Sequence, residues 1–72
     1  MYVIRTARAV YEVEYDGLTS DNGEVYTSRE FTKCERTIFA FLAAVAKSAT
    51  TDADEESRVD AIGRWLDTLP RL

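Results

Sequence analysis

Residues 2–15 (YVIRTARAVYEVEY) restrict the fold more than any other segment, because they have the composition of one unusually long β-strand. From Ala9 to Asp16, apolar side chains alternate with mainly acidic ones. Such alternation is typical of a strand with one buried face and one solvent-facing face. We therefore predict a strand over residues 2–16 with an acidic outer face.

The alternation shifts in the N-terminal half of this segment. Tyr2 and Ile4 lie in the opposite parity from Tyr11. A bulge or a bend near residues 6–8 would restore a single apolar face. The alternative is that both faces of the N-terminal half are covered.

A second strand is predicted over residues 24–31, after the turn-forming residues 20–23 (SDNG). Folding the chain at this turn places Leu18 opposite Val25 and leaves residues 2–9 without a partner in the same chain. Unpaired strand backbone tends to pair with another edge. We therefore expect a homodimer in which this segment pairs antiparallel with its copy. The dimer strand would contain Tyr2, Ile4, Thr6 and Arg8.

Two helices are expected after the strands. Thr32 and Glu35 match the S/T-x-x-E capping box, which predicts a helix over residues 33–48. Its expected apolar stripe consists of Cys34, Ile38, Phe41, Leu42 and Val45.

A second helix is predicted over residues 53–69, with Asp52 as its N-cap and Pro70 after its end. In this helix Gly63 would allow close approach of the other helix. Its expected apolar stripe consists of Val59, Ile62, Trp65, Leu66 and Leu69. The predicted fold is a single α+β domain over residues 1–72, with ββαα order and both helices on one face of the sheet.

The residue inventory excludes several classes of function. The chain has no histidine, and Cys34 is its only cysteine, so a Cys–His dyad and an intramolecular disulfide are impossible. We expect Cys34 to be buried as a small apolar residue. No glycine-rich phosphate loop or metal-binding motif occurs. We predict no catalytic residues, no cofactor and no metal.

Charge and hydropathy restrict the partners. The net charge is −4 and the basic residues are scattered along the chain, so direct nucleic-acid binding is not expected. No apolar run approaches the roughly 18 residues of a membrane span, and no signal peptide precedes the first strand. We expect a cytoplasmic protein without membrane contact.

An acidic sheet face with one aromatic residue is the predicted partner-binding surface. A basic protein surface is the natural counterpart of such a face. Three other interpretations are a merely solvated acidic face, a carboxylate pair for acid–base chemistry, and a site for a hard cation. The predicted binding residues are Glu12, Glu14, Asp16, Glu24, Tyr26 and Glu30.

These observations favour a small non-catalytic protein–protein interaction module. Phage-encoded inhibitors of host defence include small acidic proteins of this kind, in which carboxylates mimic a nucleic-acid backbone. The alternative function is a small regulatory or ligand-binding subunit with a pocket at the seam between sheet and helices or at the dimer seam.

Overall fold

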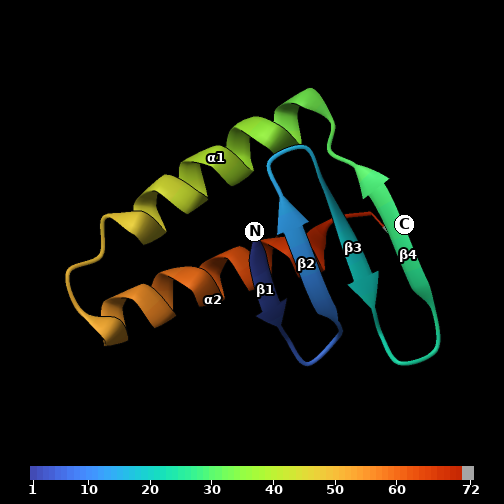
Figure 1. Ribbon diagram of the computed structural model, residues 1–72, viewed down its shortest axis with the longest axis horizontal. Helices are drawn as coiled ribbons and strands as arrows, with labels where there is room; N and C mark the ends of the chain where they lie inside the picture. Colours follow the sequence, from blue (N-terminus) through green and yellow to red (C-terminus); the bar gives the residue numbers. More distant parts are fainter. Residues whose placement is uncertain (71–72) are drawn as a thin grey trace.

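The computed structural model describes residues 1–70 as a four-stranded antiparallel sheet with two helices on one of its faces (Figure 1). The α+β class is therefore confirmed. Each strand pairs with the next one along the chain, so the strand order is β1-β2-β3-β4. The elements are β1 (Tyr2–Arg5), β2 (Val10–Glu14), β3 (Gly17–Asp21), β4 (Tyr26–Glu30), α1 (Lys33–Lys47) and α2 (Asp52–Thr68).

The predicted long strand over residues 2–16 is wrong, because this segment folds back on itself as the hairpin of β1 and β2. The Thr6 hydroxyl stabilises the turn by accepting hydrogen bonds from the backbone N–H groups of Arg8 (3.1 Å) and Ala9 (3.3 Å). The turn also explains the shift in alternation, because it pairs Ile4 directly with Tyr11 on the same sheet face. The segment that was expected to lack an intrachain partner is thus paired within the chain.

The predicted pairing of the second strand is also wrong, because β3 lies between β2 and β4. Residues 15–16 form a two-residue connection, and β3 then returns along β2. Leu18 consequently pairs with Arg29 rather than with Val25. Of the predicted turn residues 20–23, Ser20 and Asp21 end β3, whereas Asn22 and Gly23 belong to the loop that connects β3 to β4. Gly23 adopts a φ of 93° there.

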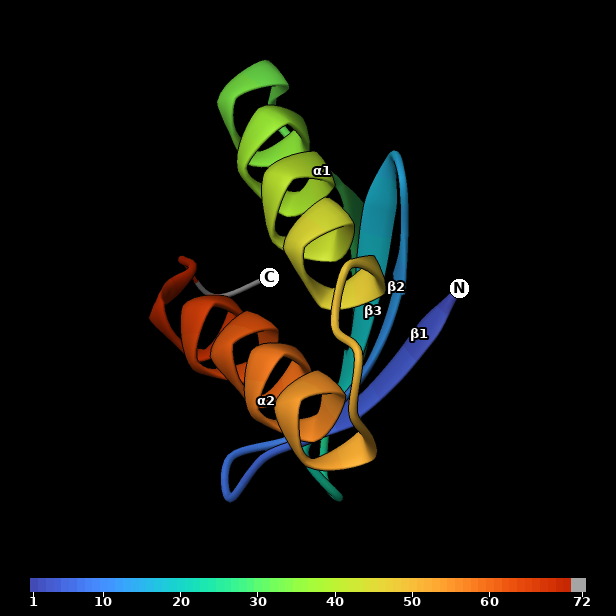
Figure 2. The same cartoon turned by 90° about the vertical axis from the view of Figure 1, so that its left-hand side faces the viewer.

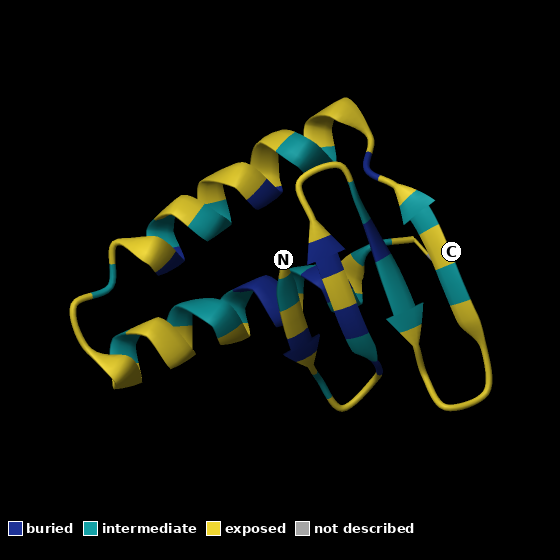
Figure 3. Cartoon of the chain, in the orientation of Figure 1, coloured by how far each residue is buried: buried dark blue, intermediate teal, exposed yellow. Residues whose placement is uncertain are grey.

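The core lies between the sheet and the helices (Figures 2 and 3). Val13 on β2 and Ile62 on α2 are fully buried, each with 0% of its surface exposed. Phe31, just after β4, lies against both helices, with ring centroids 5.7 Å from Phe39 and 5.8 Å from Trp65. The other buried apolar residues are Ile4, Ala9, Tyr11, Leu18, Phe39, Ala46 and Leu66.

Helix α1 begins with the predicted capping box, but its core-facing side only partly matches the predicted stripe: Leu42 packs against the core as expected, while the buried residues are Phe39 and Ala46. Thr32 accepts from the Glu35 N–H, and the Glu35 carboxylate accepts from the Thr32 N–H. Phe39 and Ala46 are buried, whereas Cys34 is exposed and 67% of the Phe41 surface is exposed. Phe39 faces the sheet, where its ring contacts the rings of Tyr2 and Phe31. Cys34 lies on the exposed side of the helix, so its expected burial is wrong.

Helix α2 begins one residue earlier than predicted, with Thr51 rather than Asp52 as its N-cap. Its predicted stripe faces the core, since Ile62 and Leu66 are buried. Gly63 packs against β1 rather than against the other helix: a Cβ atom there would lie 3.1 Å from Cγ2 of Ile4. No helix within residues 1–70 is long and apolar enough to cross a membrane.

Candidate functional site: the outer face of the sheet

The helices cover only one face of the sheet and leave the other open (Figure 2). Strand register aligns the outward side chains in rows across the four strands. Glu12 stands between Val3 and Thr19, and Glu14 pairs with Gly17, which also pairs with Glu30. We call this surface the outer face. It consists of Val3, Arg5, Val10, Glu12, Glu14, Gly17, Thr19, Asp21, Tyr26, Ser28 and Glu30.

All six predicted binding residues are exposed, but the structure does not gather them into one cluster. Four of them stand on the outer face, namely Glu12, Glu14, Tyr26 and Glu30. Asp16 belongs to the β2–β3 connection and Glu24 to the β3–β4 loop, which lies at the other end of the sheet (Figure 1).

Tyr26 lies away from the predicted acidic neighbours. It pairs with Asp21 in the row that also contains Arg5. With 68% of its surface exposed, Tyr26 is nevertheless available for contact. Its immediate surroundings are mixed in charge rather than purely acidic.

Four carboxylates surround a shallow depression near the β2–β3 connection, with a volume of about 390 Å³. Gly17 forms part of the lining of this depression. The backbone of β4 lies so close to Gly17 that a side chain at this position would not fit. A Cβ atom on Gly17 would lie 2.7 Å from the carbonyl oxygen of Arg29, inside any normal contact distance. We call this the acidic depression; its carboxylates belong to Glu12, Glu14, Asp16 and Glu30.

The carboxylates of the acidic depression have no ion-pair partner within residues 1–70. Arg29 also lines the depression, but its guanidinium is bound to Glu35 through two hydrogen bonds of 2.7 and 2.8 Å. The hydrogen bonds from Arg29 are the main cause that lowers the pKa of Glu35 to about 2. Arg29 is thus paired with the start of α1, while Met1, which also lines the depression, forms no ion pair within residues 1–70.

The acidic depression brings carboxylates together without forming a cluster of metal ligands in the described part of the chain. Within the described residues, no group of three or more potential ligands could hold a metal ion. The depression is shallow and open to solvent. Its chemistry is that of a cation-attracting surface.

The predicted dimer strand does not exist as one element. Tyr2 and Ile4 pair with Val13 and Tyr11 of the same chain. Thr6 and Arg8 belong to the hairpin turn, which is bound to the end of α2. The Thr6 hydroxyl donates to Oδ1 of Asp67 (2.9 Å), and Arg8 donates to the carbonyl oxygen of the same residue (2.5 Å).

Sequence reasoning missed the part of the outer face that β3 contributes. The segment GLTSD is rich in turn-forming residues and therefore lacks a strong strand signal. The available signal was the alternation that places Leu18 and Ser20 on one side and Thr19 and Asp21 on the other.

No protein-family model, curated protein or solved structure matches this chain.

Proposed function

We propose that this protein is a non-catalytic protein–protein interaction module that binds a basic surface through its outer face. The observation that carries the proposal is the acidic depression, where four exposed carboxylates lie together without a cation bound to them. Like charges held together at a surface cost free energy unless a partner neutralises them. A basic partner gains attraction and relieves this repulsion.

The rest of the outer face fits the same role. Tyr26 and Val3 expose 68% and 59% of their surfaces, and both stand on the helix-free side. Exposed aromatic and aliphatic side chains beside charges supply the apolar contact that holds a complex, while the charges guide the approach. Because the strands are short and hydrogen-bonded to one another, the surface is preorganised.

A cytoplasmic inhibitor of phage type is the specific form of this proposal. In that form the carboxylates of the acidic depression occupy the nucleic-acid-binding surface of a host defence protein. Mimicry needs anionic groups at fixed spacing on a rigid support, and neighbouring antiparallel strands provide such a support. The partner in this case is a protein with lysine- and arginine-rich surface, and neither a nucleic acid nor a membrane is bound.

Neutralising the acidic depression tests the proposal. We expect the triple variant Glu12→Gln, Glu14→Gln and Glu30→Gln to lose partners that the unmodified chain captures from a bacterial lysate. The control is a triple variant that makes the same change in charge on α2. It carries Glu55→Gln, Glu56→Gln and Asp60→Asn, and all three side chains are exposed in the unmodified chain. Captured proteins are compared by quantitative mass spectrometry.

The comparison with the control separates a specific face from general acidity. Proteins lost only from the depression variant would support the proposal. Equal loss from both variants would mean that net charge alone attracts them, and equal retention would mean that the face is merely solvated. A titration with nona-arginine at two salt concentrations gives the same comparison for one defined basic ligand.

The proposal also includes a homodimer. The segment from which the dimer was predicted is paired within the chain, so the dimer needs a different edge. β1 is an edge strand, so one side of its backbone is still open to pairing. Two copies joined antiparallel at β1 would form a continuous sheet with two acidic depressions on one side. Such a symmetric arrangement suits a symmetric partner.

A further inference from the structure

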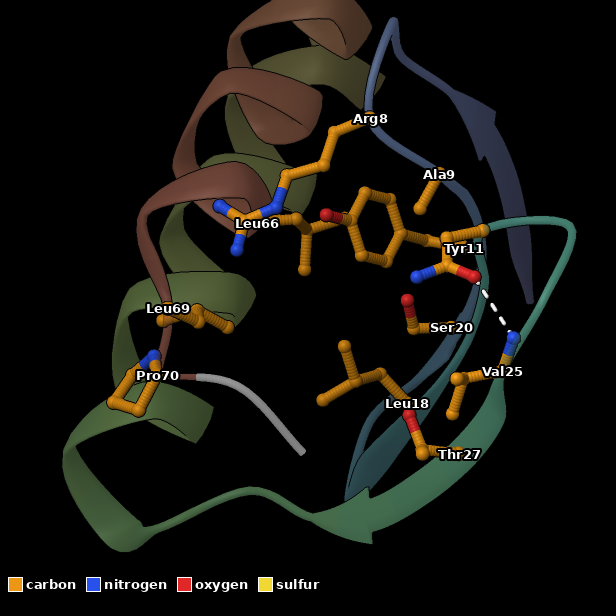
Figure 4. Close-up of a pocket in the computed structure, with 11 residues that line it drawn as sticks. Arg8, Ala9, Tyr11, Leu18, Ser20, Val25, Thr27, Leu66, Leu69 and Pro70 are labelled. Carbon is orange, nitrogen blue, oxygen red and sulfur yellow. Dashed lines mark hydrogen bonds between the residues drawn. The ribbon is translucent and has the colours of Figure 1, made fainter.

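A second hollow lies on the opposite side of the sheet, between the inner surface of β3 and β4 and the end of α2 (Figure 4). Its volume is about 270 Å³, just below the range of roughly 300–1,000 Å³ that is typical of small-molecule sites. We call it the seam pocket. It is separate from the outer face, because the sheet lies between them.

The pocket has apolar walls on two sides. Leu18 of β3 and Leu66 of α2 are 5% and 2% exposed and form part of the lining. Leu69 and Pro70 continue the wall beyond the end of α2, and Val25, with 53% of its surface exposed, faces them from the sheet side (Figure 4). Leu18 and Leu66 thus form the closed floor, and the apolar surface still open to a guest belongs to Leu69, Pro70 and Val25.

Hydroxyl groups stand on the sheet side of the pocket. Ser20 pairs with Thr27, and their row continues through Tyr11 to Ile4. The helices cover the Tyr11 and Ile4 end of this row, whereas the hydroxyl-bearing end lines the pocket. Within residues 1–70, neither the Ser20 nor the Thr27 hydroxyl makes a hydrogen bond to another group of the protein.

Arg8 supplies a positive charge at the rim. Its side chain extends over Tyr11 toward Leu66 (Figure 4), and its Nη1 donates to the carbonyl oxygen of Asp67. Within residues 1–70 the Asp67 carboxylate forms no ion pair with Arg8; its Oδ1 accepts instead from the hydroxyls of Thr6 (2.9 Å) and Tyr11 (2.6 Å). One bond fixes the guanidinium, and its Nη2 and Nε groups remain without a protein acceptor in the described chain.

We propose that the seam pocket binds a small monocarboxylate with an aliphatic body of about six to eight carbons. Its carboxylate accepts hydrogen bonds from Arg8, and its hydrocarbon chain covers the open surface of Leu69, Pro70 and Val25 above Leu18 and Leu66. A monoanion fits better than a phosphate, because one guanidinium faces the pocket and the chain as a whole carries a charge of −4. This makes ligand binding a second activity, independent of the acidic outer face.

The probe for this proposal is octanoate, titrated into the uniformly ¹⁵N-labelled full chain and followed by amide chemical shifts. A ligand of about ten heavy atoms at ordinary efficiency has a Kd on the order of 1 mM. We expect saturable shifts confined to residues around Ser20, Thr27 and Leu66. No saturable shift there at concentrations up to about 10 mM, roughly ten times this Kd, would overturn the proposal.

Charge selectivity is tested with 1-octanol and octylamine and with one matched pair of variants. Arg8→Gln removes the charge at the rim, and Arg64→Gln removes an exposed charge on α2 outside the pocket. We expect Arg8→Gln to weaken octanoate binding about tenfold and to leave octanol binding unchanged, while Arg64→Gln changes neither. Equal binding of octanoate and octanol, or tighter binding of octylamine, would refute a carboxylate site.

A plugged pocket gives an independent readout. Thr27→Phe places a strand-compatible aromatic ring in the hollow against Leu18 and Leu66. We expect this variant to unfold at a higher temperature than the unmodified chain and to lose the octanoate-induced shifts. Retained shifts in a folded Thr27→Phe variant would show that octanoate binds elsewhere and would overturn the assignment.

Discussion

At the scale of single residues, the pairing of Arg29 with Glu35 decides how the acidic depression is charged. The two side chains are 24% and 12% exposed and meet through two short hydrogen bonds. Bidentate geometry with limited solvent access makes such a pair stronger than most surface ion pairs. Because Arg29 is bound in this way, it forms no ion pair with the carboxylates of the acidic depression.

The pair predicts a pH dependence of stability. The pKa of Glu35 falls to about 2 in the folded chain from an ordinary value of 4.5. The resulting stabilisation is fully present above the ordinary value and is lost as the pH falls through the folded value. Glu35→Gln should therefore lower the free energy of unfolding by about 1 kcal/mol at pH 7, and this difference should shrink between pH 4.5 and pH 2.

Urea unfolding of both proteins at several pH values measures this difference. Glutamine can still accept the hydrogen bond from the Thr32 N–H, so the variant keeps the capping box and isolates the charge. A difference in free energy that stays constant from pH 7 to pH 3 would contradict the assignment.

At the scale of elements, local signals predicted the helices better than the strands. The capping box at Thr32 and Pro70 located both helices within about one residue. Strand pairing, however, depends on contacts between distant residues, and the turn at Thr6 lacks the glycine or asparagine that marks most hairpins. The segment therefore resembled a single strand, although the shift in parity between Ile4 and Tyr11 already carried the signal of a reversal.

Gly17 offers a test of how β3 and β4 are held together. An alanine there places its Cβ 2.7 Å from a backbone oxygen of β4, and backbone moves less readily than a side chain end. We expect Gly17→Ala to lower the free energy of unfolding by about 1–3 kcal/mol. Thr19→Ala, on the same strand and face, should cost less than about 1 kcal/mol. Urea unfolding followed by Trp65 fluorescence measures both, and equal costs would argue against the clash.

At the scale of the whole molecule, the open side of β1 determines the expected oligomer. Val3 stands on β1 with 59% of its surface exposed, and antiparallel pairing of two copies would bring two such residues close together. We expect the unmodified chain to have the mass of a dimer and Val3→Lys that of a monomer, because lysine on an edge opposes pairing. Light scattering at several concentrations tests this; a monomeric unmodified chain would contradict the dimer.

The candidate site was predictable in composition but not in arrangement. Alternation alone placed Glu12 and Glu14 together on the open side, because side chains two apart in a strand share a face. The position of β3 determines the rest. It brings Glu30 near Glu14, on either side of Gly17, and it places Tyr26 away from both. The seam pocket was foreseen only as a general possibility, since it depends on where α2 ends relative to β4.

The order of strands in the sheet also has a consequence for how the molecule assembles. Every strand pairs with its neighbour in sequence, so each hairpin closes only a short loop, and such pairings form quickly. The exception is the contact of α2 with the β1–β2 turn, where Asp67 accepts a hydrogen bond from Thr6, near the other end of the chain. A chain emerging from the ribosome can therefore pair all four strands before α2 exists. The last helix closes the structure, and with it the pocket beside Arg8.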